Sequence, residues 1–232
     1  MKVINNLRTR YFSTRLLSRV ATESPYQDFR SDATTKPTEK MRESLVNYAS
    51  GAADHDEHLN ALERAYSHLF QKEDAMFVPS GSQGNIIALM AHASRAGGAA
   101  IVGSKSHIAT AEQGSVSTFG SLFSLTIENQ PDGTIPLEDV ERALLGRSNI
   151  HLPGVECVSL ENTHGVLGGI VLPLSYMQEA RDLCTQHKAK LHLDGARVLN
   201  AAVSLGVEPS EITQYADSVM SCISKGGGCS NR

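Results

Sequence analysis

The chain has 232 residues, 41% of them hydrophobic, and a formal net charge of −4 from 21 basic and 25 acidic side chains. This length suits one substantial core better than two full-sized domains, and the mixed charges give no polycationic face for nucleic acid. Because no apolar run approaches the roughly 18 residues of a membrane-spanning helix, we expect small-molecule partners and neither nucleic acid nor membrane.

The sequence contains no pattern typical of a metal site or a disulfide framework. Its four cysteines form no C-x-x-C pair and have no regular spacing, which favours a reducing compartment. The run His55-Asp56-Glu57-His58 resembles a metal motif, but it lacks the H-E-x-x-H spacing and reads as a solvated helix start. We therefore expect no bound metal.

The first 24 residues differ in composition from the rest of the chain. They carry five basic residues and several hydroxyl residues, and no acid precedes Glu23. Transit peptides have this composition, so we expect a mitochondrial matrix protein with a folded domain over residues 25–232. The alternative is a disordered basic arm on a cytoplasmic protein.

The first elements of the domain are predicted from apolar spacing. Thr38 can cap a helix that carries Met41, Leu45 and Tyr48 on one face, and a second amphipathic helix follows with apolar residues from Leu59 to Leu69. The apolar run Ala75–Val78 then reads as a buried strand that ends in a tight turn before a further helix.

Strands and helices alternate along the remainder of the chain. The apolar runs predict strands at 100–102, 122–127, 155–160, 190–193 and 218–223, and helices at 86–90, 137–145, 176–187 and 197–204. Such alternation is typical of an α/β fold, with a mostly parallel sheet flanked by helices.

A turn rich in glycine and serine follows the first predicted strand. The run Ser80-Gly81-Ser82-Gln83-Gly84-Asn85 opens a helix, so its backbone N–H groups and the positive end of the helix dipole can hold a phosphate. The run is neither a Walker loop nor G-x-G-x-x-G, and an ordinary turn remains the alternative.

Two later strand ends carry an acid and a lysine. Asp194 ends a strand with Arg197 three residues on, and a buried carboxylate there needs a cationic or hydrogen-bonding partner. A protonated pyridine nitrogen would be such a partner, and a helix-capping role is the alternative. Lys225, in Ser224-Lys225-Gly226, follows the last predicted strand and is followed by glycines.

Several motifs, in this order, resemble those of threonine aldolases over residues 28–226. The resemblance is carried by Phe29-Arg30-Ser31-Asp32, Phe77–Asn85, Leu160–His164, Leu193–Arg197 and Ser224-Lys225-Gly226. It implies a fold-type-I large domain that binds pyridoxal 5'-phosphate, and an oligomer in full-length relatives. It further implies that threonine and allo-threonine are cleaved to glycine and acetaldehyde, in glycine biosynthesis and threonine catabolism.

The resemblance also implies roles for single residues. Lys225 would hold the cofactor covalently, Gly81 and Ser82 its phosphate, and Asp194 its ring nitrogen, while His107 would stack on the ring. Arg197 would sit near the cofactor phenolate and the substrate carboxylate, and Ser31 would help hold that carboxylate. His107 and His164 are the candidate bases, because imidazole titrates near neutral pH, and the sequence does not choose between them.

The chain departs from the family pattern after Lys225. Relatives continue with an antiparallel strand and a small C-terminal domain, whereas this sequence ends at Arg232. We expect this form to be weak, unstable or inactive, so the alternative function is at most that of a cofactor-binding or subunit-interacting protein. A related cofactor enzyme that performs β-elimination or transamination is a third hypothesis.

Overall fold

The structure, a computed structural model, describes residues 30–49, 55–94, 96–146 and 151–228. The predicted basic arm of residues 1–24 lies outside these ranges. The chain divides into two units, Met1–Thr34 and Thr35–Arg232. In the first unit, the described residues form a 3₁₀ turn at Asp32–Thr34. All elements described below belong to the second unit.

The second unit is built on a parallel five-stranded sheet with the strand order β2-β1-β3-β4-β5. The strands are β1 Ala99–Gly103, β2 Phe123–Ile127, β3 Val155–Glu161, β4 Lys190–Asp194 and β5 Ser218–Met220. β1 and β3 are buried along their whole length, as expected for strands that are covered on both faces. The predicted α/β class and parallel sheet are confirmed.

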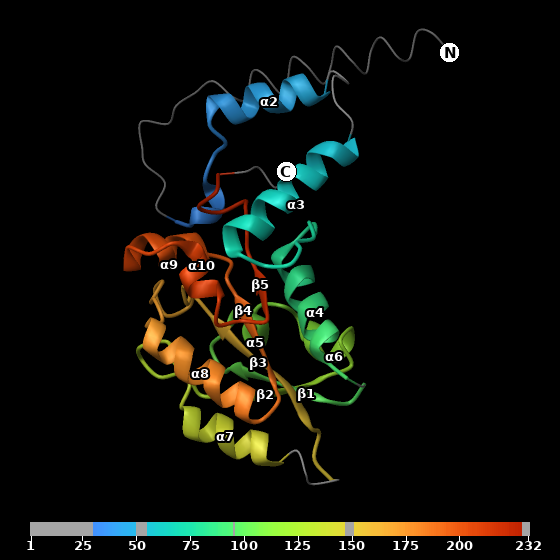
Figure 1. The fold of residues 1–232 in the computed structure, drawn as a ribbon, viewed down its shortest axis with the longest axis vertical. Coiled ribbons are helices and arrows are strands. Elements are labelled where there is room, and N and C mark those ends of the chain that lie inside the picture. The colour runs from blue at the N-terminus through green and yellow to red at the C-terminus, as the bar shows by residue number, and fades with distance from the viewer. Residues whose placement is uncertain (1–29, 50–54, 95, 147–150, 229–232) are drawn as a thin grey trace, which may run out of the picture. The chain divides into compact units, whose positions relative to one another are not determined.

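Helices cover both faces of the sheet (Figure 1). One face packs against α4 Gly81–His92, α5 His107–Thr110 and α6 Ser115–Thr118. The other packs against α7 Leu137–Leu145, α8 Leu174–Gln186, α9 Val198–Leu205 and α10 Pro209–Thr213. Strand side chains alternate between these cores, so that Ile101 joins the α8 side while Ala100 and Val102 join the α4 side.

The two N-terminal helices of this unit are α2 Glu39–Ala49 and α3 His55–Phe70. Thr38 caps α2 as predicted, since its Oγ1 accepts a hydrogen bond of 3.3 Å from the Met41 N–H. Leu45, on the predicted apolar face of α2, is 59% exposed. α3 buries Phe70 in the core at its C-terminal end. Among the described residues, no helix combines the length and apolarity needed to cross a membrane.

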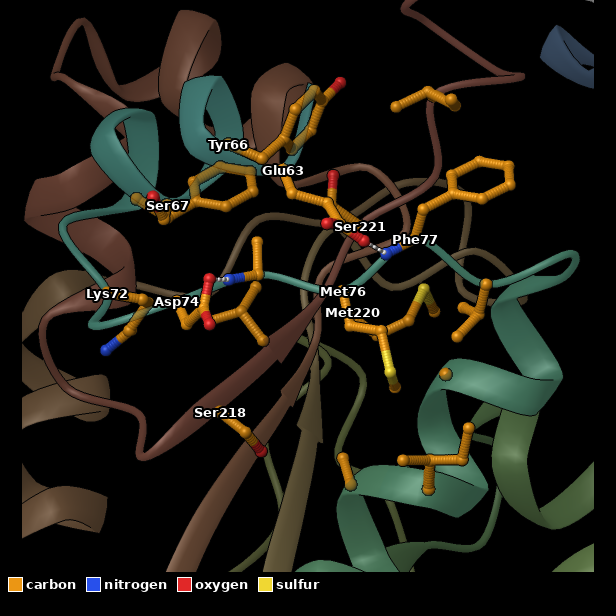
Figure 2. A pocket seen from close by; sticks show the side chains of 18 of the residues that line it. Glu63, Tyr66, Ser67, Lys72, Asp74, Met76, Phe77, Ser218, Met220 and Ser221 are labelled. Atoms are coloured by element: carbon orange, nitrogen blue, oxygen red, sulfur yellow. Dashed lines mark hydrogen bonds between the residues drawn. The ribbon is translucent and has the colours of Figure 1, made fainter. Parts of the chain in front are cut away.

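The predicted strand Ala75–Val78 is wrong, because its backbone pairs with no strand of the described chain. The Phe77 N–H donates instead to the Glu63 carboxylate at 2.7 Å (Figure 2). Met76 and Phe77 are 63% and 48% exposed, so the apolar run is not buried as predicted. The last strand is also shorter than predicted, since residues 221–223 leave the sheet.

Candidate functional site

Polar residues gather at the point in the sheet where the strand order reverses, between β1 and β3. From β1 the chain passes to β2 on one side of it, whereas β3, β4 and β5 follow on the other side. Ligands of open α/β sheets bind at such a switch point, beyond the carboxyl ends of the strands. His107 follows β1, and its backbone N–H donates a 2.7 Å hydrogen bond to Glu161 at the end of β3.

The strand register brings further polar side chains to the α4 face. Asp194 pairs with Glu161 on one side and with Met220 on the other, and His192 pairs with Ser218. Side chains two residues apart share a face of a strand, so His192 and Asp194 both point away from the core that contains their neighbour Leu193. One strand therefore supplies both an imidazole and a carboxylate.

Asp194 is the central buried acid of the cluster, with an exposed fraction of 2%. Its Oδ2 accepts from Asn85 Nδ2 at 3.0 Å, and its Oδ1 accepts from the Ala196 N–H at 3.2 Å. Burial raises the pKa of Asp194 to about 6, the Glu161 and Glu112 carboxylates add to the rise, and the two hydrogen bonds oppose it. This carboxyl group therefore lacks sufficient cationic compensation from the protein.

His107 converges on the same acid. Its Nδ1 lies 2.9 Å from Glu112 Oε1, and one ligand atom each of His107, Glu112 and Asp194 lie within 4.8 Å of one another. The hydrogen bond to Glu112 raises the pKa of His107, burial opposes this, and the charges of Glu112, Asp194 and Glu161 support it. The ring is 44% exposed, so one side of it remains accessible to a ligand.

The predicted phosphate turn forms the start of α4. Ser80 is its N-cap, and its side chain accepts from the Gln83 N–H at 3.2 Å. The N–H groups of Gly81 and Ser82 have no acceptor within the helix, as in the first turn of any α-helix. A Cβ at Gly81 would lie 3.1 Å from Cys222 Sγ, so this turn faces the segment that follows β5.

Lys225 lies in the turn that follows β5, and the Gly228 N–H donates to its carbonyl at 2.9 Å. The Cys222 thiol feels the charges of both Lys225 and Asp194. Burial raises the pKa of the Cys222 thiol and the Asp194 charge adds to the rise, while the charges of Lys225 and Arg197 oppose it. Lys225, Asp194 and Arg197 are thus all close enough to act on one thiol.

Arg197 lies over the turn that follows β3. Its Nη1 is 3.0 Å from the position a Cβ would take at Gly165, and Glu161 Oε1 is 3.4 Å from the same point. Glu161 also accepts from the Gly165 N–H at 2.8 Å. The guanidinium therefore lies beside a carboxylate that also accepts a hydrogen bond from the His107 N–H.

His164 and Ser31, two further predicted site residues, remain unassigned. The His164 ring is 1% exposed, and neither ring nitrogen has a hydrogen-bond partner among the described residues. Its Cβ faces Gly133, and its backbone pairs with Ile170. Ser31 belongs to the first unit, where its Oγ accepts from the Ala33 N–H at 3.2 Å. The roles implied for both stay predictions.

The sequence analysis missed the residues that surround Asp194, which are Asn85, Glu112, Glu161, His192, Ser218 and Cys222. A signal was present for His192, because an imidazole two residues before a strand-end acid must share its face. Glu112 carried no such signal, since its position follows from the short helix α5, which was not predicted.

A cavity of about 930 Å³ lies beside the cluster, between β5 and the segment 72–80 (Figure 2). Ser80, Gly81 and Cys222 line one part of it, whereas Asp194, His107 and Lys225 do not line it. We locate the candidate site at the polar cluster because the converging titratable groups mark the chemistry, whereas the cavity is mainly an apolar hollow.

The position of Asp194 depends on its neighbour Gly195. A Cβ there would lie 2.9 Å from the Met220 carbonyl oxygen and 3.1 Å from Val198 Cβ, so the backbones must separate. We expect Gly195→Ala to lower the free energy of unfolding by about 1–2 kcal/mol, measured by urea denaturation. Gly146→Ala is the control, because its new methyl would meet only an ordinary contact at 3.6 Å. Equal effects of the two substitutions would contradict the expectation.

Comparison with known proteins identifies the family. Residues 28–230 match the model of the beta-eliminating lyase family. The chain belongs to this family. The beta-eliminating lyase match includes the start of α4, the end of β4 and the Lys225 turn, and therefore the whole cluster described above.

Similar proteins include a probable low-specificity L-threonine aldolase 2 of Arabidopsis thaliana, which is 41% identical over 87% of this chain and 58% of that protein. The low specificity L-threonine aldolase of Escherichia coli strain K12 is 39% identical, over 87% and 60% of the two chains. A Leishmania major threonine aldolase structure superposes with a TM-score of 0.68 at 25% identity, over 81% of this chain and 55% of that one. The chain thus spans less than two thirds of these relatives.

Proposed function

We propose that this chain carries the cofactor-binding part of an aldolase that cleaves threonine and allo-threonine to glycine and acetaldehyde with pyridoxal 5'-phosphate. The names of its relatives support the substrate class, and the polar cluster supports the cofactor. We further propose glycine biosynthesis and threonine catabolism in the mitochondrial matrix, with the cytoplasm as the alternative, and a homo-oligomer. The amino-terminal composition supports the matrix assignment.

The cluster fits pyridoxal phosphate on two observations. The buried carboxyl of Asp194 has a raised pKa, and among the described residues its hydrogen-bond donors, Asn85 and Ala196, are neutral, so a protonated ring nitrogen would supply a cation. The start of α4 offers N–H groups to a phosphate next to the Lys225 segment. When bound, the cofactor supplies an electron sink for the electrons released by bond cleavage.

The residues of the chain have separate tasks in this proposal. Asp194 would keep the ring nitrogen protonated, Gly81 and Ser82 would hold the phosphate, and His107 would stack on the ring. Lys225 would provide the amine that holds the cofactor covalently.

Substrate groups are assigned to the remaining residues. Arg197 binds the substrate carboxylate, and Ser31 assists it. His107 or His164 would accept the β-hydroxyl proton as the general base.

The observation that carries the proposal is the convergence of an imidazole, a buried acid and an amine-bearing turn at one end of the sheet. The test is to add pyridoxal phosphate to the purified chain, follow the visible absorbance of lysine-bound cofactor, and measure acetaldehyde release from threonine. We expect the absorbance, together with acetaldehyde release that is weak. Absorbance without acetaldehyde would favour the alternative of a cofactor-binding protein, and product from another amino acid would favour β-elimination or transamination. Absence of cofactor binding would refute the proposal.

A further inference from the structure

A continuous row of hydrogen bonds runs beneath the candidate site from α4 to the outer strand β5. His92 Nε2 lies 2.7 Å from Ser218 Oγ, and the same oxygen lies 2.7 Å from His192 Nδ1. His192 Nε2 lies 3.1 Å from Asn85 Oδ1, and Asn85 Nδ2 reaches Asp194 at 3.0 Å. Three elements, α4, β4 and β5, therefore contribute to the surroundings of one carboxylate.

The direction of donation along this row of hydrogen bonds is set by Asn85, at the end of the row next to Asp194. Asn85 Nδ2 lies between two acids, at 3.0 Å from Asp194 Oδ2 and 2.9 Å from Glu112 Oε1. Ionised carboxylates only accept hydrogen bonds, so the atom that faces both must be the amide nitrogen with its two hydrogens. The amide oxygen then needs a donor, which can only be a protonated Nε2 of His192.

The tautomer of His192 fixes the outer part of the row. His192 is fully buried, and burial lowers its pKa to about 3, so the ring is neutral and carries one proton. With that proton on Nε2, Nδ1 accepts, and the Ser218 hydroxyl must donate to it. Ser218 Oγ is then left to accept from His92 Nε2. Every donor thus points towards Asp194.

We infer that Asn85 is a positioning residue that holds the Asp194 carboxylate in place, and that Ser218, acting through the tautomer of His192, keeps the Asn85 amide turned towards the acid. The row orients groups and does not conduct protons, because a side-chain amide has no titratable proton to pass on. This inference deepens the proposed function, in which Asp194 pairs with the cofactor nitrogen.

Asn85 belongs to the same helix as the proposed phosphate-binding turn. It lies one helical turn after Gly81 in α4, so both residues lie on the same face of the helix. The helix that offers its start to a phosphate therefore also holds the acid that would meet the ring of the same ligand. The spacing between the two contacts is set by one rigid element.

The first test uses the protein without cofactor. Side-chain ¹⁵N NMR reports which His192 nitrogen carries the proton, and we expect Nε2 in the wild type. Ser218→Ala removes the donor to Nδ1, so we expect a mixture of tautomers, whereas Ser218→Thr keeps the hydroxyl and should restore the wild-type signal. Ser117→Ala, at an exposed serine of α6, is the matched control. A wild-type proton on Nδ1 would overturn the inference.

The second test measures the acid itself. Carboxyl ¹³C NMR, assigned with Asp194→Asn, gives the pKa of Asp194 while Glu112, Glu161, His107, Arg197, Lys225 and Cys222 stay unchanged around it. We expect Asn85→Leu to make Asp194 about tenfold weaker as an acid, and Ser218→Ala to shift it in the same direction by less. Unchanged pKa values in both variants would refute the inference.

These outcomes separate the inference from the proposed function. Failure of the wild type to bind pyridoxal phosphate would refute the function, but it would not alter the NMR results on the cofactor-free chain. If the cofactor binds, Ser218→Ala should also lower kcat for threonine more than it raises KM, and Ser218→Thr should recover the loss. A variant that binds cofactor with a normal Asp194 pKa and normal kcat would show that Ser218 only packs.

Discussion

Replacing Lys225 with alanine is expected to abolish the visible absorbance of bound pyridoxal phosphate and to reduce acetaldehyde release from threonine by about 10³-fold or more. Lys225 is the amine to which the proposed function assigns covalent attachment, and its charge acts on the Cys222 thiol together with that of Asp194. Absorbance spectra and an aldehyde assay measure the two effects separately.

The control for Lys225→Ala is Lys40→Ala, an exposed lysine of α2 that should change neither signal. The fold should tolerate both substitutions, and circular dichroism with urea unfolding would verify this. Lys225→Arg keeps the charge but cannot form the bond, so it should retain the electrostatic effect on Cys222 without covalent binding. Full absorbance in Lys225→Ala would show that a different amine holds the cofactor.

The order of elements could be predicted from the sequence because each buried strand and its covering helix carry their own apolar period. Val155–Glu161 is apolar or buried at every position, and the strand was predicted to within one residue. Ala75–Val78 has the same local composition and yet forms no strand, since pairing requires a neighbouring backbone that local composition does not report. Phe77 finds a side-chain acceptor instead.

The candidate site could be predicted in part because its residues follow strand ends. Asp194 and the start of α4 were found this way, whereas His107 was implied by the resemblance to threonine aldolases. In the structure His107 lies close to Asp194, and Asn85 of α4 donates a hydrogen bond to Asp194. Asn85 was quoted in the turn motif but received no role, because its function depends on two acids from other segments. The role of the Asn85 amide can be recognised only when the register of β3, β4 and β5 is known, because the register places its partners His192 and Asp194.

The glycines after Lys225 have a local packing reason that the sequence does not reveal. In the structure, a Cβ at Gly227 would lie 2.6 Å from the Ile223 carbonyl oxygen, and one at Gly226 would lie 2.8 Å from Asn200 Oδ1. These residues are therefore small because the turn is tightly packed against itself and against α9.

The pH dependence of stability should reveal Asp194 directly. Its pKa is raised from 3.8 to about 6 in the folded chain, chiefly by burial. Between these values the folded state binds more protons than the unfolded state, so the free energy of unfolding falls as pH rises and the loss is complete above about pH 6. A shift of about two pH units corresponds to roughly 2–3 kcal/mol.

Asp194→Asn isolates this contribution, because the substituted side chain does not titrate. We expect the difference in unfolding free energy between wild type and Asp194→Asn, measured by urea denaturation of the cofactor-free chain, to change by roughly 2–3 kcal/mol between pH 4 and pH 7, with the wild type losing stability. His107, whose raised pKa also makes stability fall as pH rises, contributes to both proteins and largely cancels.

Pyridoxal phosphate should reverse this behaviour if its ring nitrogen meets Asp194. A cation beside the carboxyl favours the ionised form and returns its pKa towards the ordinary range, so the wild type with cofactor should lose its extra pH dependence, while Asp194→Asn should bind the cofactor more weakly. A difference that is independent of pH in the cofactor-free chain would show that Asp194 is already compensated by the protein. Asp194 would then need no cationic partner, and the proposed cofactor site depends on that need.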